Sequence, residues 1–128
     1  MTDDLIKLGQ CAVACRGWKW MPGMRTLDAM RVIHDPDRWP DRPCAIREGG
    51  WVDTAPPRPL GDDLPDLTDP ATLGCLLALV REAWGDPTMS VHFSDTADWW
   101  EVQGHRWAPG KPADTEAEAL VAALEAAP

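Results

Sequence analysis

Proline is the residue that most limits how this chain can fold. Eight of its thirteen prolines lie between Asp35 and Pro70, where no sustained helical period is present. Proline lacks a backbone N–H and fixes φ, so this stretch cannot form a long helix or a central strand. A chain of 128 residues fits one domain. We therefore expect a single domain over 1–128 with a Pro-rich irregular insert at about 35–69, polyproline-like over 55–61.

Three segments outside the insert carry the apolar spacing of helices, and we place them at 4–16, 70–84 and 115–126. Gly17 is expected just past the first helix, in the left-handed conformation that glycine adopts most easily. Asp69 and Pro70 are typical of the cap and the first position of the second helix. The third begins with a capping box, Thr115-Glu116-Ala117-Glu118.

The apolar period changes from 3.6 to 2 after the second helix, which predicts a hairpin with strands 89–94 and 99–103. The fold class is therefore α+β, a small α/β sandwich whose antiparallel sheet is packed by about three helices. Shorter strands are expected at 31–33, at Cys44–Arg47 and at Trp51–Val52, the last two joined by a turn at Gly49-Gly50. The predicted core is Leu73, Leu76, Leu77, Val80, Val91, Phe93, Trp100, Val102, Leu120 and Leu124.

Charge is distributed unevenly along the chain. Residues 1–60 hold nine bases and eight acids, whereas residues 61–128 hold three bases and thirteen acids. Duplex DNA binding needs clustered Lys and Arg, so we expect no direct contact with duplex DNA. The longest apolar run, Leu76 to Val80, is too short to cross a bilayer, and Met1 is not followed by a basic segment. We expect a cytoplasmic protein with no membrane contact.

No residue pattern of the chain points to catalysis, a cofactor or a metal. The four cysteines (Cys11, Cys15, Cys44 and Cys75) lack the paired spacing of zinc knuckles and are typical of free thiols in a reducing compartment. The three histidines belong to no metalloprotease motif, and no nucleophile elbow or phosphate loop is present. We expect a protein that is not an enzyme.

The aromatic composition is unusual: eight Trp, one Phe and no Tyr. So many indoles exceed what a small core can bury, and partly exposed Trp is enriched at interfaces, which favours a partner surface or a homodimer. Basic and aromatic residues interleave near the first helix, a pattern suited to stacking on a nucleobase and pairing with its phosphate. That set is Trp18, Lys19, Trp20, Arg25 and Arg31.

A second candidate surface lies on the polar face of the hairpin. His92, Trp99 and Glu101 alternate away from the predicted core face and would be neighbours across the two strands. Helices on one sheet face only would leave these side chains exposed together, as a binding surface. Helices on both faces would bury Trp99, and we favour burial.

Two segments resemble those of small uncharacterised proteins of tailed phages and prophages: Trp18-Lys19-Trp20-Met21-Pro22-Gly23-Met24 and residues 65–85. The Trp-rich hairpin with its Ala/Glu/Leu helix is similar to the phage ABA sandwich domain family. The resemblance implies an α/β sandwich made in a bacterial host cytoplasm, and it brings no catalytic residue.

Two functions follow from these features. The first is a non-catalytic phage accessory protein that binds and inhibits a host protein, as a counter-defence (anti-CRISPR-like) factor would. Its contact residues would be carboxylates presented where phosphates would otherwise lie: Asp62, Asp63, Asp66 and Asp69. The alternative is a protein that sequesters a nucleotide signal through the Trp and Arg set or through the hairpin face.

Overall fold

The computed structural model describes residues 2–47, 57–104 and 112–128, and it is an α+β fold. The predicted strand at Trp51–Val52 and its turn lie outside the described residues. The helices are α1 (Thr2–Ala14), α2 (Pro70–Trp84) and α3 (Glu116–Glu125), and the strands are β1 (Met30–Ile33), β2 (Cys44–Arg47), β3 (Arg58–Pro59), β4 (Ser90–Ser94) and β5 (Trp99–Gln103).

The caps predicted for α2 and α3 are confirmed. The Asp69 side chain accepts from the Thr72 backbone N–H, and Gly85 ends α2 in the left-handed region at φ 62°. Thr115 likewise accepts from the Glu118 N–H at the start of α3. These side chains satisfy backbone groups that a helix end leaves unpaired, so local sequence fixes where both helices begin.

Gly17 does not have the predicted left-handed conformation. Among the described glycines only Gly23 and Gly85 have positive φ. A Cβ at Gly17 would lie 3.1 Å from side-chain atoms of both Ala83 and Leu124. The residue is therefore suited to the close approach of three chain segments, rather than to a helix cap.

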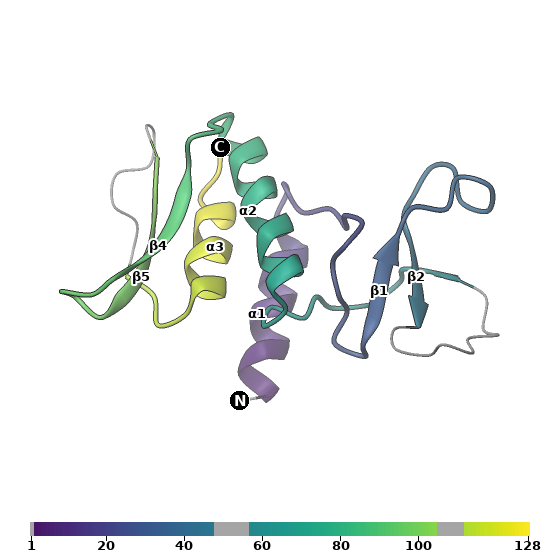
Figure 1. The fold of residues 1–128 in the computed structure, drawn as a ribbon, viewed down its shortest axis with the longest axis horizontal. Helices are drawn as coiled ribbons and strands as arrows, with labels where there is room; N and C mark the ends of the chain where they lie inside the picture. Colours follow the sequence, from purple (N-terminus) through teal and green to yellow (C-terminus); the bar gives the residue numbers. More distant parts are fainter. Residues whose placement is uncertain (1, 48–56, 105–111) are drawn as a thin grey trace.

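The three helices lie side by side between two small sheets, and all three run in the same direction (Figure 1). Helix α3 contacts α1, α2 and both strands of the hairpin. Its buried side is nearly continuous, with Ala119, Leu120, Val121, Ala123 and Leu124 all buried. The shortest helix thus joins the hairpin to the other two helices.

Both sheets are antiparallel. The hairpin β4–β5 pairs Val91 with Val102, His92 with Glu101 and Phe93 with Trp100. The second sheet has the order β1-β2-β3, in which Val32 faces Ala45. Strand β3 lies in the stretch expected to be polyproline-like. It contributes only two residues to the edge of the sheet, where proline is tolerated.

The predicted core is correct at its centre and wrong at Phe93. Leu76, Val80, Val102, Leu120 and Leu124 are buried. Phe93 is 42% exposed because it lies next to the turn of the hairpin, whose end extends beyond α3 in Figure 1. The other four predicted core residues are partly buried and pack against the core: Leu73, Leu77, Val91 and Trp100.

Candidate functional site

Two of the predicted acidic contact residues, Asp66 and Asp69, pair with two arginines of the predicted basic and aromatic set. Arg25 Nη1 lies 2.8 Å from Asp66 Oδ2, and Arg31 Nη1 lies 2.9 Å from Asp69 Oδ2. The two arginines pair with each other in an isolated antiparallel bridge, and Arg31 belongs to β1. These ion pairs tie the start of α2 to β1 and to the segment that leads into it.

Asp69 is held by hydrogen bonds within the chain. Its Oδ2 accepts from the Thr72 N–H at 3.0 Å, from the Thr72 hydroxyl at 2.9 Å and from Arg31. Burial of the carboxyl raises its pKa, but the hydrogen bonds from Arg31 and Thr72 outweigh burial, so the pKa lies below its usual range. Asp69 is therefore a structural residue.

Asp63 is also engaged within the chain. Both of its oxygens accept from Arg58, at 2.8 and 2.9 Å, and this hydrogen bonding lowers the pKa of the Asp63 carboxyl despite its burial. Asp62 is the one exposed member of the predicted set. The acidic contact of Asp62, Asp63, Asp66 and Asp69 stays a prediction, but reversing all four charges would damage the fold, because three of these residues hold arginines.

The tryptophans of the predicted basic and aromatic set pack on the core. Trp18 and Trp20 meet edge to face with ring centroids 5.3 Å apart, and both are partly buried against core residues. Lys19 forms an ion pair with Glu82 at 3.1 Å. Because Arg25 and Arg31 bond to carboxylates as well, the set does not present a cluster of cations to a phosphate.

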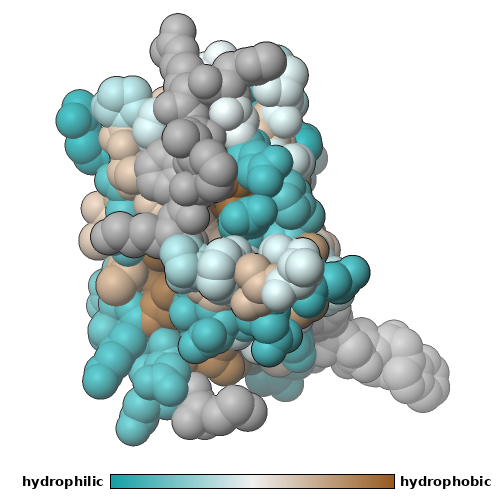
Figure 2. Space-filling model, turned by 90° about the vertical axis from the view of Figure 1, so that its left-hand side faces the viewer, coloured by the Kyte–Doolittle hydropathy of each residue, from teal (hydrophilic) through white to brown (hydrophobic). Residues whose placement is uncertain are grey.

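The hairpin face predicted from the strand alternation is assembled. His92 Nε2 lies 3.4 Å from Glu101 Oε1, and Trp99 Nε1 donates to Glu101 Oε2 at 3.4 Å. Within the described residues, helices cover only the other face of this sheet (Figure 1), and Trp99 is 37% exposed, so the prediction of a buried Trp99 is wrong. Figure 2 shows this side of the molecule as largely hydrophilic.

The cysteines form neither a metal site nor a reactive pair in the described structure. All four are free, and no group of three His, Cys, Asp or Glu residues could hold a metal ion within the described ranges. Burial raises the pKa of the thiols of Cys15, Cys44 and Cys75, which disfavours the thiolate that nucleophilic attack requires.

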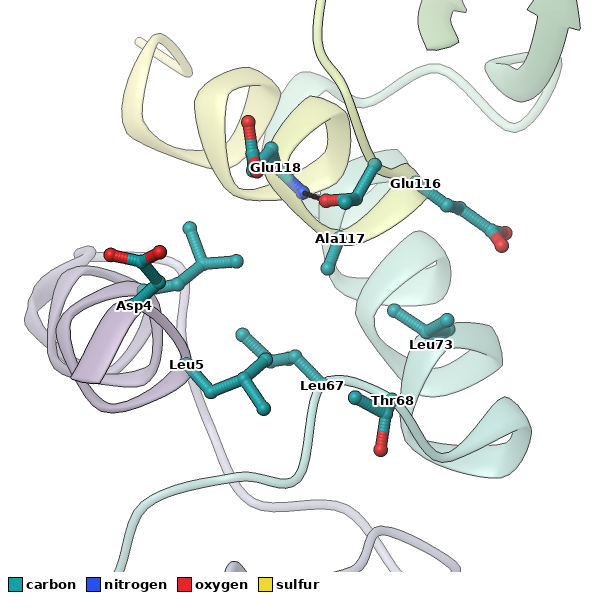
Figure 3. Close-up of a pocket in the computed structure, with 10 residues that line it drawn as sticks. Asp4, Leu5, Leu67, Thr68, Leu73, Glu116, Ala117 and Glu118 are labelled. Carbon is teal, nitrogen blue, oxygen red and sulfur yellow. Dashed lines mark hydrogen bonds between the residues drawn. The ribbon is translucent and has the colours of Figure 1, made fainter. Parts of the chain in front are cut away.

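A groove that no sequence pattern indicates lies where the three parallel helices of the described residues begin. It encloses about 380 Å³. Figure 3 shows that Leu5 of α1, Leu67 before α2 and Ala117 of α3 face the same space. The groove lining is Asp4, Leu5, Leu8, Leu67, Thr68, Leu73, Thr115, Glu116, Ala117 and Glu118.

The groove combines an apolar floor with a negative rim. Its five apolar residues are Leu5, Leu8, Leu67, Leu73 and Ala117, and its charged residues are Asp4, Glu116 and Glu118. No lysine or arginine is among the described lining residues. Each helix start carries a partial positive charge of about half a unit, which offsets only part of three full negative charges. The groove therefore favours an apolar group that carries a positive charge.

Part of this site was visible in the sequence. Leu5 and Leu8 lie on the apolar stripe of the first helix, and the capping box places Glu116 and Glu118 in the first turn of the third. Each signal has a local explanation, since acidic residues stabilise helix N-termini. Only the parallel arrangement of the helices brings these residues of α1 and α3 together in one groove.

Comparisons with protein-family models, with curated proteins and with solved structures found no match. The resemblance to phage proteins therefore stays a prediction. No helix within the described ranges is long and apolar enough to cross a membrane.

Proposed function

We propose that this protein is a non-catalytic binding protein whose groove holds an apolar segment, flanked by Lys or Arg, of a partner protein. The observation that carries the proposal is the apolar floor inside a rim of Asp4, Glu116 and Glu118. Apolar burial supplies affinity in such a site, while charge complementarity selects the partner and speeds encounter.

The resemblance to phage proteins extends this proposal to the partner's identity. The partner would be a host protein, and binding would inhibit it, as in counter-defence. A host surface rich in Lys and Arg that otherwise binds nucleic acid has the chemistry that the acidic rim selects. A gene located beside counter-defence genes would support this part, which rests on the resemblance alone.

The alternative, sequestration of a nucleotide signal, has weaker support. A nucleotide phosphate needs cations directed toward it, whereas Arg25 and Arg31 bond to Asp66 and Asp69. On the hairpin face, His92 lies beside the carboxylate of Glu101, which would repel a phosphate.

The proposal is tested by fluorescence anisotropy with three labelled helical peptides that differ only in composition: Lys with Leu, Glu with Leu, and Lys with Ser. We expect saturable binding of the Lys-Leu peptide alone. Leu5→Ser should weaken that binding about tenfold, because Leu5 is part of the apolar floor. Leu27→Ser is the matched control, since Leu27 is exposed and does not line the groove.

The rim is tested with the triple variant Asp4→Asn, Glu116→Gln and Glu118→Gln. It should bind the Lys-Leu peptide less tightly, and its affinity should depend less on salt concentration than that of the native protein. Asp3→Asn is the control, because Asp3 lies in the same first turn of α1 outside the lining. Equal binding of all three peptides, or native affinity in Leu5→Ser, would contradict the proposal.

A further inference from the structure

The backbone of β4 directs hydrogen-bonding groups toward its free edge. On β5, Trp100 exchanges both of its backbone hydrogen bonds with Ala113, at 2.8 and 3.0 Å, on the side away from β4. Its partner across the hairpin, Phe93, is therefore at a non-hydrogen-bonded position of the ladder. Hydrogen-bonded and non-hydrogen-bonded pairs alternate along an antiparallel pair of strands, so Val91, two residues from Phe93, is at the same kind of position. The backbone N–H and C=O of both residues therefore point away from β5, toward the free edge of β4.

This outer edge is unprotected in the described part of the chain. Within the described residues, the sheet of the hairpin consists of β4 and β5 alone. The described bridges add only Ala113 to it, on the side of β5. The strand Ser90–Ser94 contains no Lys, Arg, Asp, Glu or Pro, the residues that usually block pairing at a sheet edge. Phe93, beside the hairpin turn, is 42% exposed. The edge has the features of a strand that pairs with another strand.

The strand is also complementary to itself. Its sequence Ser-Val-His-Phe-Ser is close to a palindrome about His92. A two-fold axis at His92 would place Val91 of one copy opposite Phe93 of the other, in both directions. Both residues present their outward backbone groups at those positions, so four hydrogen bonds would form, and Phe93 would be covered by the partner's Val91.

We propose that two copies of this protein associate through antiparallel pairing of their β4 strands, which makes one four-stranded sheet across a two-fold axis. Such isologous pairing is the commonest symmetry of protein dimers, and addition of a strand to a free edge is a recurrent mode of recognition. The helix-start groove is not part of this interface, so the dimer would present two grooves.

Light scattering and sedimentation over a range of concentrations test the association. We expect a monomer–dimer equilibrium in which Phe93→Lys weakens the dimer about tenfold or more, because a buried charge would replace the aromatic contact. Trp99→Lys is the matched control: Trp99 is an exposed aromatic of the same hairpin that lies on β5. A native protein that stays monomeric, or a dimer equally weakened by both variants, would overturn the proposal.

Cysteine cross-linking tests the position of the two-fold axis even if Phe93→Lys fails to fold. In the proposed dimer, His92 of one copy would lie opposite His92 of the other at a non-hydrogen-bonded position. Their Cα atoms would be about 4.5 Å apart, within the range that a disulfide spans. His92→Cys should therefore form a cross-linked dimer under mild oxidation. Ser94→Cys should not, because it would face Ser90 of the other copy. The native protein, with its own free thiols, sets the background. If His92→Cys were cross-linked no more than the native protein, the proposed pairing would be overturned.

Discussion

At the scale of single residues, the partners of the charged side chains could not be predicted from the sequence. Asp66 and Arg25 are 41 residues apart in the chain, and Asp69 and Arg31 are 38 apart. Asp69 was correctly predicted as a helix cap because a cap is a local feature. The ion pairs were missed because nothing in the sequence relates two charges at such separations.

These carboxylates make stability depend on pH in a defined direction. The pKa values of Asp63 and Asp69 are lowered in the folded protein, so the unfolded chain binds more protons as pH falls. Their stabilising contribution is complete above the usual carboxyl pKa and is lost progressively below about pH 4.

The measurement is the urea midpoint as a function of pH. Asp63→Asn should lower stability at neutral pH and flatten the fall below about pH 4, because one of the shifted groups is removed. Asp62→Asn is the control, since Asp62 is the exposed neighbour. An equal effect of both variants on the acid limb would contradict the structural role of the Asp63–Arg58 pair.

At the scale of elements, local patterns predicted the helices and the hairpin but not the extent of their burial. The change of period placed both strands of the hairpin within one residue of the observed bounds. The exposure of Phe93 depends on how far α3 reaches, and its ten residues span about 15 Å. Whether a residue at the end of a strand is buried thus depends on tertiary packing, which the local pattern does not contain.

The packing of α3 against both other helices and the hairpin gives a prediction about stability. Leu120 is fully buried, so Leu120→Ala should lower the free energy of unfolding by about 2–5 kcal/mol. Trp99→Ala should cost less than about 1 kcal/mol, because the Trp99 side chain is exposed. Chemical denaturation of both variants compares the two losses. A larger loss for Trp99→Ala would contradict the one-sided packing of the hairpin.

At the scale of the whole molecule, the parallel helices decide where a site can form. Two long connections, one through β1–β3 and one through the hairpin, return the chain to the same end of the molecule before α2 and α3 begin (Figure 1). The lining residues of the groove therefore come from three helix starts that are far apart in sequence. Neither the periodicity of Leu5 and Leu8 nor the capping box at Thr115 contains that information.

The most direct test of the groove as the binding site is to map the amide resonances that shift when the Lys-Leu peptide is added to the isotopically labelled protein. We expect saturable shifts concentrated at the helix starts, at Leu5, Thr68 and Ala117, with the resonances of Trp20 and Gln103 unchanged. Shifts concentrated on the hairpin or at Trp18–Trp20, or spread evenly over the acidic surface, would contradict it.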